Sequence, residues 1–155
     1  MTRAPPTLAV LAAALNAMFA GSALACEGQQ SQTKLVIVVD NVKNDVGLLT
    51  AAVYPDDAAR FLKFNGSLVT ARTTPVAPST QVCLWLPRPG GYAVAAYQDL
   101  NRNLKWDHEG LKVEPFGFSN NPHIVFSPPS LAATRFQVPA GETTIHIRLH
   151  HSVPS

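Results

Sequence analysis

The sequence has little charge of either sign. It contains 12 Lys and Arg residues and 10 Asp and Glu residues, which together make up 14% of the chain. Arg3 is the only one of them in residues 1–25, so 11 basic residues face 10 acidic ones beyond this point. Proteins that bind nucleic acids usually carry an excess of Lys and Arg, which neutralises phosphate groups. The near balance gives no electrostatic reason to expect a nucleic-acid partner.

The sequence also lacks the common signatures of enzymes. It has no G-x-S-x-G, H-E-x-x-H or C-x-x-C pattern and no phosphate-binding glycine loop. Cys83 could act as a nucleophile only beside an activating base, which the sequence does not identify. We therefore favour a non-catalytic binding or envelope-accessory module, whose partner would be a small molecule, a glycan or an envelope protein. The alternative is a small transthyretin-like hydrolase of the periplasm, in which His108 or His123 would meet Arg and Ser residues in one cleft.

Only one apolar run approaches the length of a membrane helix, and it lies at the N-terminus. Arg3 precedes an apolar stretch over residues 8–20, and Ala23-Leu24-Ala25 fits the A-x-A rule of signal peptidase. The run is short for a bilayer span. We therefore predict a secretory signal peptide over residues 1–25 and one mature domain over residues 26–155. The mature chain would be periplasmic or extracellular, with no transmembrane segment.

The chain contains two cysteines, Cys26 and Cys83. In an oxidising compartment the simplest prediction is a disulfide between them, which would stabilise the fold by about 4 kcal/mol in the chain-entropy model. Two unpaired thiols are the alternative. Cys26 would also begin the mature chain, which raises the question of a lipid anchor. We do not favour an anchor, because Ala23 stands where lipoprotein signals usually carry Leu.

The mature sequence consists of short runs of β-branched and aromatic residues separated by Gly, Pro, Asn and Asp. This pattern is typical of an all-β domain. We predict a single antiparallel β-sandwich, Ig-like or prealbumin-like, with six or seven strands and at most one short helix. The predicted hairpins pair residues 34–42 with 48–54, 81–86 with 91–98, and 134–138 with 143–149.

Two further elements and the orientation of one strand follow from local patterns. Asp56 or Asp57 is expected to cap a short helix, and residues 68–71 may form a minor strand. In the last strand Ile147 alternates with polar residues, so one face should lie in the core. Val94 is expected to be buried opposite it.

Residues 99–133 are predicted to form a long loop with at most one short strand, at 123–126. Long irregular segments in compact domains usually carry function, or they are fixed by something other than strand pairing. We therefore predict that this loop is the functional face of the domain.

The loop begins with DLNRNLKWD, which has the spacing of a calcium-binding loop. At EF-hand positions the ligands would be the side chains of Asp99, Asn101, Asn103 and Asp107 and the backbone carbonyl of Lys105. Leu104 occupies the usual glycine position, Gly110 stands where a bidentate acid is expected, and Arg102 with Lys105 balances the two acids. We expect no obligatory cofactor and at most weak Ca²⁺ binding, with a Kd of about 10⁻⁴ to 10⁻³ M. The alternative is a set of Asx-turns without an ion.

Aromatic and amide residues follow in the same loop. The predicted binding-loop residues are Trp106, Phe116, Phe118, Ser119, Asn120 and Asn121, because aromatics and amides are common contact residues. The alternative is structural: the aromatic rings would cover the open end of the sandwich, and the Asn side chains would satisfy loop backbone groups.

The last strand carries polar residues on its exposed face. His146, Arg148 and His150, with His151, could converge on a transition metal, because alternate residues of a strand share a face. A solvated terminal strand explains them without a ligand, and we prefer that interpretation.

Several of these motifs occur together in one family. The segments and positions concerned are residues 89–94 (PGGYAV), Asp99, Asn101, Asn103, Asp107, Glu114-Pro115, residues 117–121 (GFSNN), Pro128-Pro129 and Phe136. In these the chain resembles a bacterial secreted family known as domain of unknown function 2141. The resemblance implies an exported single domain with a prealbumin-like or carboxypeptidase-regulatory-like sandwich, and no established activity. The chain departs from the family pattern at Gln98, Leu104 and Ser127, where the family often has His, Gly and Gly.

The departure at Leu104 weakens the calcium prediction, because a γ-branched residue is strained in the left-handed conformation that glycine adopts easily. We expect either that the loop takes another shape here or that Leu104 packs inward.

Overall fold

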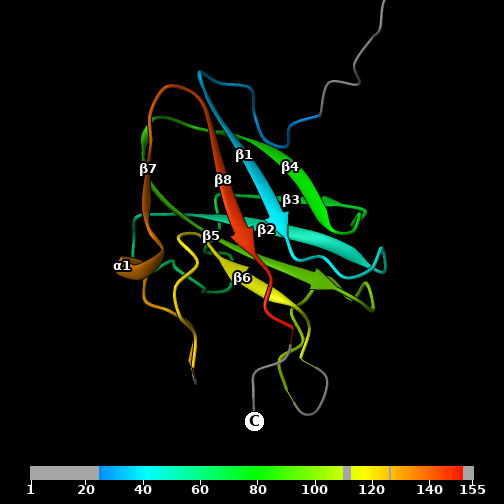
Figure 1. Ribbon diagram of the computed structural model, residues 1–155. Helices are drawn as coiled ribbons and strands as arrows, with labels where there is room; N and C mark the ends of the chain where they lie inside the picture. The colour runs from blue at the N-terminus through cyan, green and yellow to red at the C-terminus, as the bar shows by residue number, and fades with distance from the viewer. Residues whose placement is uncertain (1–24, 110–112, 126, 152–155) are drawn as a thin grey trace, which may run out of the picture.

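The computed structural model describes residues 25–109, 113–125 and 127–151, so the predicted signal peptide, apart from Ala25, lies outside the described residues. The described part forms two packed β-sheets and one short helix (Figure 1). The elements are β1 (Thr33–Asp40), β2 (Leu48–Pro55), β3 (Val69–Thr73), β4 (Ser79–Leu86), β5 (Gly90–Asp99), β6 (Phe116–Phe118), α1 (Leu131–Thr134), β7 (Phe136–Val138) and β8 (Gly141–Arg148). The predicted all-β sandwich is confirmed.

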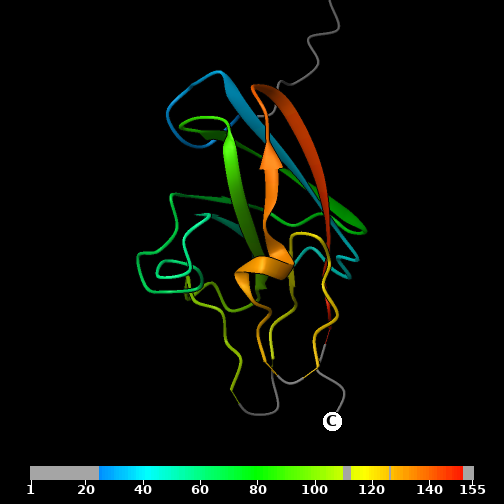
Figure 2. The same ribbon diagram turned by 90° about the vertical axis from the view of Figure 1, so that its left-hand side faces the viewer.

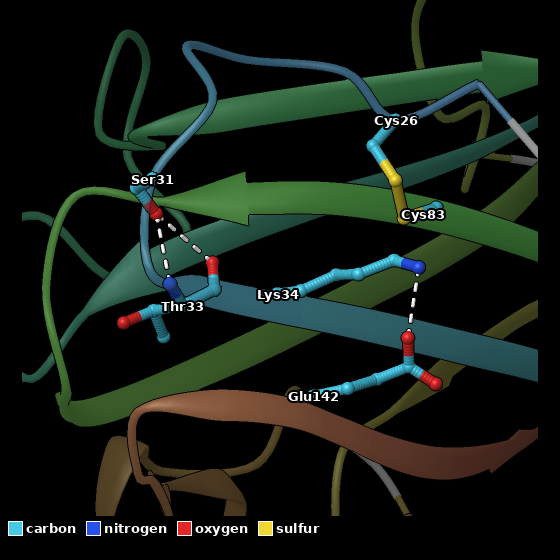
Figure 3. Close-up of a disulfide and its surroundings, with 6 residues drawn as sticks. All are labelled: Cys26, Ser31, Thr33, Lys34, Cys83 and Glu142. Atoms are coloured by element: carbon cyan, nitrogen blue, oxygen red, sulfur yellow. Dashed lines mark hydrogen bonds and ion pairs between the residues drawn. A yellow bond between two sulfur atoms is a disulfide. The ribbon is translucent and has the colours of Figure 1, made fainter.

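The smaller sheet has three strands in the order β4-β1-β8. β1 is antiparallel to β4 and parallel to β8. The parallel pair corrects the prediction of a purely antiparallel sandwich. On the outer face of this sheet, Lys34 Nζ lies 2.8 Å from Glu142 Oε2 and joins β1 to β8 (Figure 3).

The larger sheet has the order β3-β2-β5-β6, and β7 also pairs with β5. β6 pairs with β5 at residues 95–97, and β7 pairs with it at residues 90–92. β6 and β7 therefore follow one another along β5, and β7 lies beside β5 in Figure 2. The strand predicted at residues 123–126 is wrong for residues 123–125, which are not in a strand, and Phe126 lies outside the described residues.

The main core lies between the two sheets. Most strands contribute alternate apolar side chains to this core, because successive side chains point to opposite faces. Val94 and Ile147 are completely buried, as predicted, and Leu149 is also buried. Ile145 is partly buried against the same cluster.

The three predicted hairpins are wrong. β1 and β2 belong to different sheets, as do β4 and β5, and also β7 and β8. The turn-forming residues mark where the chain reverses, but they do not specify the sheet that receives the next strand. In each case the connection crosses from one layer of the sandwich to the other.

The helix predicted after Asp56 is also wrong, since residues 57–62 form turns. Asp57 Oδ1 accepts a hydrogen bond from the Ala59 N–H, but Leu62 and Asn65 have positive φ angles of 55°, which interrupt a right-handed helix. Ala58 and Ala59 are exposed, whereas Phe61 is buried. Within the described residues no helix is long and apolar enough to cross a membrane.

The first described residues cover an edge of β4. The Glu27 N–H donates to the Cys83 carbonyl (2.9 Å), and the Glu27 carbonyl accepts from the Trp85 N–H (2.8 Å). Cys26 and Cys83 form the predicted disulfide, with 4.4 Å between their Cα atoms (Figure 3).

Truncation of Ile147 tests the core. Because its side chain is completely buried, we expect Ile147→Ala to lower the free energy of unfolding by about 2–5 kcal/mol. Thr144→Ala, on the exposed face of the same strand, should change it by less than about 0.5 kcal/mol. Urea unfolding followed by circular dichroism measures both values, and equal effects would contradict the assignment of strand faces.

Removal of the disulfide tests its contribution. The two cysteines are 57 residues apart in sequence, so we expect Cys26→Ser/Cys83→Ser to lose roughly 4 kcal/mol of stability, because the unfolded chain gains freedom. A reducing agent should destabilise the wild-type protein and leave this double variant unchanged. A wild-type protein with two thiols that alkylate without reduction would contradict the bridge.

Candidate functional site

A second apolar cluster lies on the outer face of the larger sheet, away from the main core. Its buried members are Phe61, Ala93, Phe116 and Phe118. The partly buried side chains around them are Tyr54, Leu62, Ala95, Tyr97, Trp106, Val113, Ile124 and Leu131. We call this set the aromatic cluster. It is the apolar layer on which the long segment after β5 lies.

The rings of the aromatic cluster touch mostly edge to face. The ring centroids of Tyr54 and Phe61 are 5.5 Å apart, and those of Phe116 and Phe118 are 6.0 Å apart. The Trp106 ring lies 4.9 Å from Phe116, and its indole N–H donates to the carbonyl of residue 114 at 3.1 Å. These rings cover a sheet face, which corrects the expectation that they close the open end of the sandwich.

Two tyrosines of the cluster are electrically neutral at ordinary pH. Burial raises the pKa of Tyr54, and the neighbouring Tyr97 raises it further. Burial likewise is the main cause that raises the pKa of Tyr97. Both hydroxyl groups therefore stay protonated at neutral pH and add no charge to this face.

An open hollow of about 260 Å³ is sunk into the aromatic cluster. It is lined by Trp106, His108, Phe116 and Phe118, and by Val113 and residues 124, 125, 127 and 128. His108 is exposed and stacks on Trp106, with 4.6 Å between ring centroids and 21° between ring planes. Val125 is 47% exposed. Phe116 and Phe118 are buried and Trp106 is partly buried, so the hollow exposes mainly the His108 ring and aliphatic groups. A concave, largely apolar lining is typical of small-ligand sites.

Asp99 fixes the beginning of the long segment. Its carboxylate is completely buried at the end of β5. Oδ1 accepts from the Asn103 N–H (3.1 Å), and Oδ2 accepts from the Leu104 N–H (2.7 Å). Hydrogen bonds from backbone N–H groups stabilise a buried carboxylate in its charged form. The first turn of the segment is therefore closed around this side chain.

Glu114 fixes the other side of the same turn. Its side chain is 4% exposed. Oε1 accepts from the Leu100 N–H (2.7 Å), and Oε2 accepts from the Asp107 N–H (3.0 Å). The Asp107 carbonyl also accepts from the Glu114 N–H (2.9 Å). Glu114 is thereby joined to residues 100 and 107, which precede it in the segment.

Backbone N–H groups take the place of counter-ions for these two carboxylates. The ion pairs that Lys and Arg form among the described residues are Lys34–Glu142 and Arg135–Asp56, and His146 lies against Asp40. None of them includes Asp99 or Glu114. A buried carboxylate without donors is costly, so each acid depends on the loop that it holds, and the loop depends on the acid.

The amides of the calcium-like loop face its remaining carboxylate. Nδ2 of Asn101 and Nδ2 of Asn103 donate to Asp107 Oδ2, at 2.6 and 2.9 Å. The Oδ1 atoms of the two Asn residues accept from backbone N–H groups of residues 103 and 105, as in Asx-turns. Two N–H donors of the loop therefore contact the Asp107 carboxylate. A bound cation would need oxygen atoms at these positions.

This donor arrangement does not fit a preorganised Ca²⁺ site. The five predicted ligand residues do lie in one compact loop, but the amide oxygens of Asn101 and Asn103 accept backbone hydrogen bonds. Lys105 is exposed, and Gly110 lies outside the described residues. An entering ion would have to break two amide–carboxylate hydrogen bonds before it gained ligands.

Leu104, which stands at the usual glycine position, adopts neither of the two arrangements expected from the sequence. Its φ is 64°, so the loop keeps the left-handed turn that glycine would favour. Its side chain is 54% exposed and does not pack inward. Both expected outcomes, a different loop shape and an inward Leu, are therefore wrong.

Ser119, Asn120 and Asn121 hold the segment in place. The Ser119 hydroxyl accepts from the Val94 N–H (2.9 Å) and donates to the Thr134 carbonyl (2.6 Å). It thereby occupies the place on β5 between β6 and β7. Asn120 Nδ2 donates to the carbonyls of residues 133 and 135, at 3.3 and 2.9 Å. These side chains are engaged with the protein itself.

Asn121 acts like one residue of an extra strand beside β8. Its Nδ2 donates to the His146 carbonyl (3.0 Å), and its Oδ1 accepts from the Arg148 N–H (2.7 Å). The two bonds satisfy backbone groups on an otherwise open strand edge. Sequence reasoning offered this role for the Asn side chains as the structural alternative.

The polar residues at the end of β8 are dispersed. His146 Nδ1 lies 2.9 Å from Asp40 Oδ2, and the His150 ring lies 5.9 Å from the Phe116 ring. His151 Nε2 is close to the Asn41 carbonyl. Among the residues that the structure describes, no three His, Cys, Asp or Glu side chains are grouped as metal ligands.

Two residues with central positions were underestimated from the sequence. In the sequence, Glu114 stood out only as part of the Glu114-Pro115 motif. Gln98, which is completely buried, donates through Nε2 to the carbonyls of Asn44 and Val46, at 3.1 and 2.7 Å. It connects the end of β5 to the loop between β1 and β2. In the sequence, this role was indicated only by the position of an amide residue, Gln98, at the end of an alternating strand.

The match to known proteins agrees with the resemblance seen in the sequence. The family model described as "Uncharacterized protein conserved in bacteria (DUF2141)" matches residues 37–146. Searches of curated proteins and of solved structures found no significant match. The prealbumin-like detail of the fold therefore stays a prediction. The matched residues include every strand from β2 to β7, half of β1 and most of β8, and the chain belongs to the DUF2141 family of uncharacterized bacterial proteins.

Proposed function

We propose that the protein is an exported, non-catalytic binding module whose ligand occupies the hollow in the aromatic cluster. The observation that carries the proposal is a concave apolar site on a fixed segment, lined by the buried rings of Phe116 and Phe118 and by exposed groups such as Val125. Apolar surfaces of this kind commonly mark binding sites.

The hollow rests on a rigid frame. Phe116 and Phe118 lie in β6, which is hydrogen-bonded to β5. Trp106 is held by its indole hydrogen bond and by the ring of Phe116. A preformed site loses little conformational entropy on binding, so even a small apolar contact area contributes to affinity.

The size and lining of the hollow restrict the ligand. About 260 Å³ is slightly below the usual range of drug-sized pockets. A single ring, a short aliphatic chain or one sugar unit suits this volume. The exposed polar groups at the hollow are those of His108 and Ser127, which could orient a ligand by hydrogen bonds. A small molecule, a glycan or an apolar side chain of an envelope protein fits this description.

Export is supported by two independent features. Residues 1–25 have the charge and hydrophobicity pattern of a secretory signal. The bridge between Cys26 and Cys83 is the kind of bond that persists in oxidising compartments and is rare in the cytosol.

The hydrolase alternative has little geometric support. His108 and Ser127 line the same hollow, but the lining includes no Arg. His123 is exposed and is not among the lining residues. Turnover in a broad hydrolase screen that His108→Ala abolishes would favour the enzyme over the binding module.

Titration with the apolar dye 1-anilinonaphthalene-8-sulfonate tests the hollow. We expect saturable fluorescence with one dye per protein, and about fivefold weaker binding by Val125→Asn, because the variant removes apolar contact area. Val125 is exposed, so the substitution should leave the melting temperature unchanged.

Leu68→Asn is the matched control for the dye titration. Leu68 is 39% exposed and lines a different hollow beside Trp85. The Leu68→Asn variant should bind the dye as the wild-type protein does. If Leu68→Asn lost dye binding and Val125→Asn bound the dye normally, the dye site would be the hollow beside Trp85 and not the hollow in the aromatic cluster.

We also propose that the loop over residues 99–107 binds Ca²⁺ only weakly. With a Kd of about 10⁻⁴ to 10⁻³ M, 1 mM Ca²⁺ would contribute about 0.4–1.4 kcal/mol, hence about one to five degrees in melting temperature. Asn101→Asp/Asn103→Asp should lower the melting temperature in EDTA and enlarge the calcium response, because carboxylates replace the two amide donors that face Asp107.

Gln29→Glu/Gln30→Glu provides the charge-matched control on the exposed N-terminal segment. It should respond to Ca²⁺ as the wild-type protein does. Identical melting temperatures in EDTA and in 5 mM Ca²⁺ for the Asn101→Asp/Asn103→Asp variant would exclude this loop as a cation site.

A further inference from the structure

Exposed aliphatic side chains gather at one end of the sandwich. Seven large hydrophobic side chains are exposed among the described residues, and four of them lie on three loops at this end. They are Val46 (55%), Val76 (56%), Leu100 (38%) and Leu104 (54%). We call this group the aliphatic tip. It shares no residue with the hollow in the aromatic cluster.

Direct hydrogen bonds hold the three loops of the tip together. The Ala77 N–H donates to Asp45 Oδ1 at 2.7 Å, which joins the loop after β3 to the loop after β1. Gln98 Nε2 donates to the Val46 carbonyl at 2.7 Å, which joins the loop after β1 to the end of β5. In Figure 1 these loops lie together on the right-hand side. The three loops that carry the four side chains therefore lie side by side.

Gly47 shows how closely the loops approach. Its φ is +82°, and a Cβ atom at this position would lie 2.0 Å from the Asp99 carbonyl oxygen. Backbone from the loop after β1 is thus in contact with backbone at the start of the long segment. A glycine is required here, because any side chain would separate Val46 from Leu100.

The hydrogen bond from the Leu104 N–H to Asp99 fixes a left-handed turn that does not bury the Leu104 side chain. A non-glycine residue with φ of 64° is strained, and its exposed side chain gains no burial in return. Arg102, two residues earlier, is also left-handed, with φ of 61°. The strained turn projects an aliphatic side chain into solvent between two basic residues, Arg102 and Lys105.

The exposed charge at the tip is mainly positive. Lys43, Arg102 and Lys105 are exposed there, against one exposed acid, Asp45, whose carboxylate accepts the hydrogen bond described above. The Asp99 carboxylate is buried and bonded to backbone N–H groups. The Asp107 carboxylate is bonded to two Asn amides. An anionic surface would therefore meet three cations around an aliphatic centre.

We propose that the aliphatic tip docks the protein onto an anionic lipid surface. Val46, Val76, Leu100 and Leu104 enter the headgroup region, and the neighbouring Lys and Arg side chains contact lipid phosphates. A lipid surface fits better than a protein partner, because protein interfaces are typically centred on Trp, Tyr or Arg anchors in well-packed pockets. The tip consists of aliphatic loop ends and does not contain an aromatic anchor among its exposed residues.

Vesicle sedimentation tests the proposal with the mature protein. We expect the protein to sediment with vesicles of phosphatidylglycerol and phosphatidylethanolamine, and to stay in the supernatant with pure phosphatidylcholine. Leu100→Ser/Leu104→Asn should lower the partition coefficient by about tenfold, because it removes the central aliphatic side chains. Arg102→Gln/Lys105→Gln should lower it by about tenfold or more and reduce its dependence on salt.

Two further measurements distinguish lost docking from a lost fold. Asn tolerates the left-handed conformation better than Leu, so Leu104→Asn alone should melt no lower than the wild-type protein while it binds vesicles less well. Phe64→Ser is the control at the opposite end of β2, because Phe64 lies on the connection from the end of β2 to β3. Phe64 is 95% exposed, and its replacement should leave vesicle binding unchanged.

Three results would overturn the proposal. The first is wild-type protein that does not sediment with anionic vesicles. The second is equal loss of vesicle binding in Phe64→Ser and in the tip variants. The third is a concentration-dependent dimer in sedimentation velocity that the tip substitutions abolish without any effect on vesicles, which would identify the tip as a contact between two copies of the chain.

Discussion

Two buried carboxylates that form no ion pair among the described residues determine the shape of the long segment after β5. Asp99 and Glu114 together accept four backbone N–H bonds from residues 100, 103, 104 and 107. These bonds bring the two sides of the segment together and aim its aromatic residues back at the sheet. The hollow exists because this turn is closed, and the aliphatic tip projects because the same turn forces Leu104 outward. One electrostatic constraint therefore positions both candidate surfaces.

The sequence was informative about strands and about the core, but not about strand partners. Residues that became β1, β2, β4, β5 and β8 stood out as apolar runs, and Val94 and Ile147 were correctly placed between the sheets. Pairing was not encoded in these local patterns. Glycine, proline and asparagine mark a reversal of the chain, whereas the choice of sheet depends on how the whole set of apolar faces packs.

For the candidate site, too, the sequence indicated which residues belong to it but not which contacts they make. Trp106, Phe116 and Phe118 were recognisable from residue type, and the structure brings them together at one hollow. The roles of Asp99 and Asn101 were ambiguous, because a cation ligand and an Asx-turn use the same side-chain oxygen. Only the direction of each amide group distinguishes the two, and spacing does not specify that direction. Glu114 was hard to assign, since its backbone partners come from residues up to 14 positions away.

The central position of β1 has a consequence for the order of folding. β1 begins at Thr33, yet its parallel partner β8 ends at Arg148, and both edges of β1 are filled only when β4 and β8 have arrived. A ladder that joins the two ends of the domain has a high contact order, and such domains fold slowly. A nascent chain that has not yet released its last strand would leave Ile37 and Val39 without their neighbours in β8. The topology thus delays completion of the smaller sheet until the last strand of the domain is available.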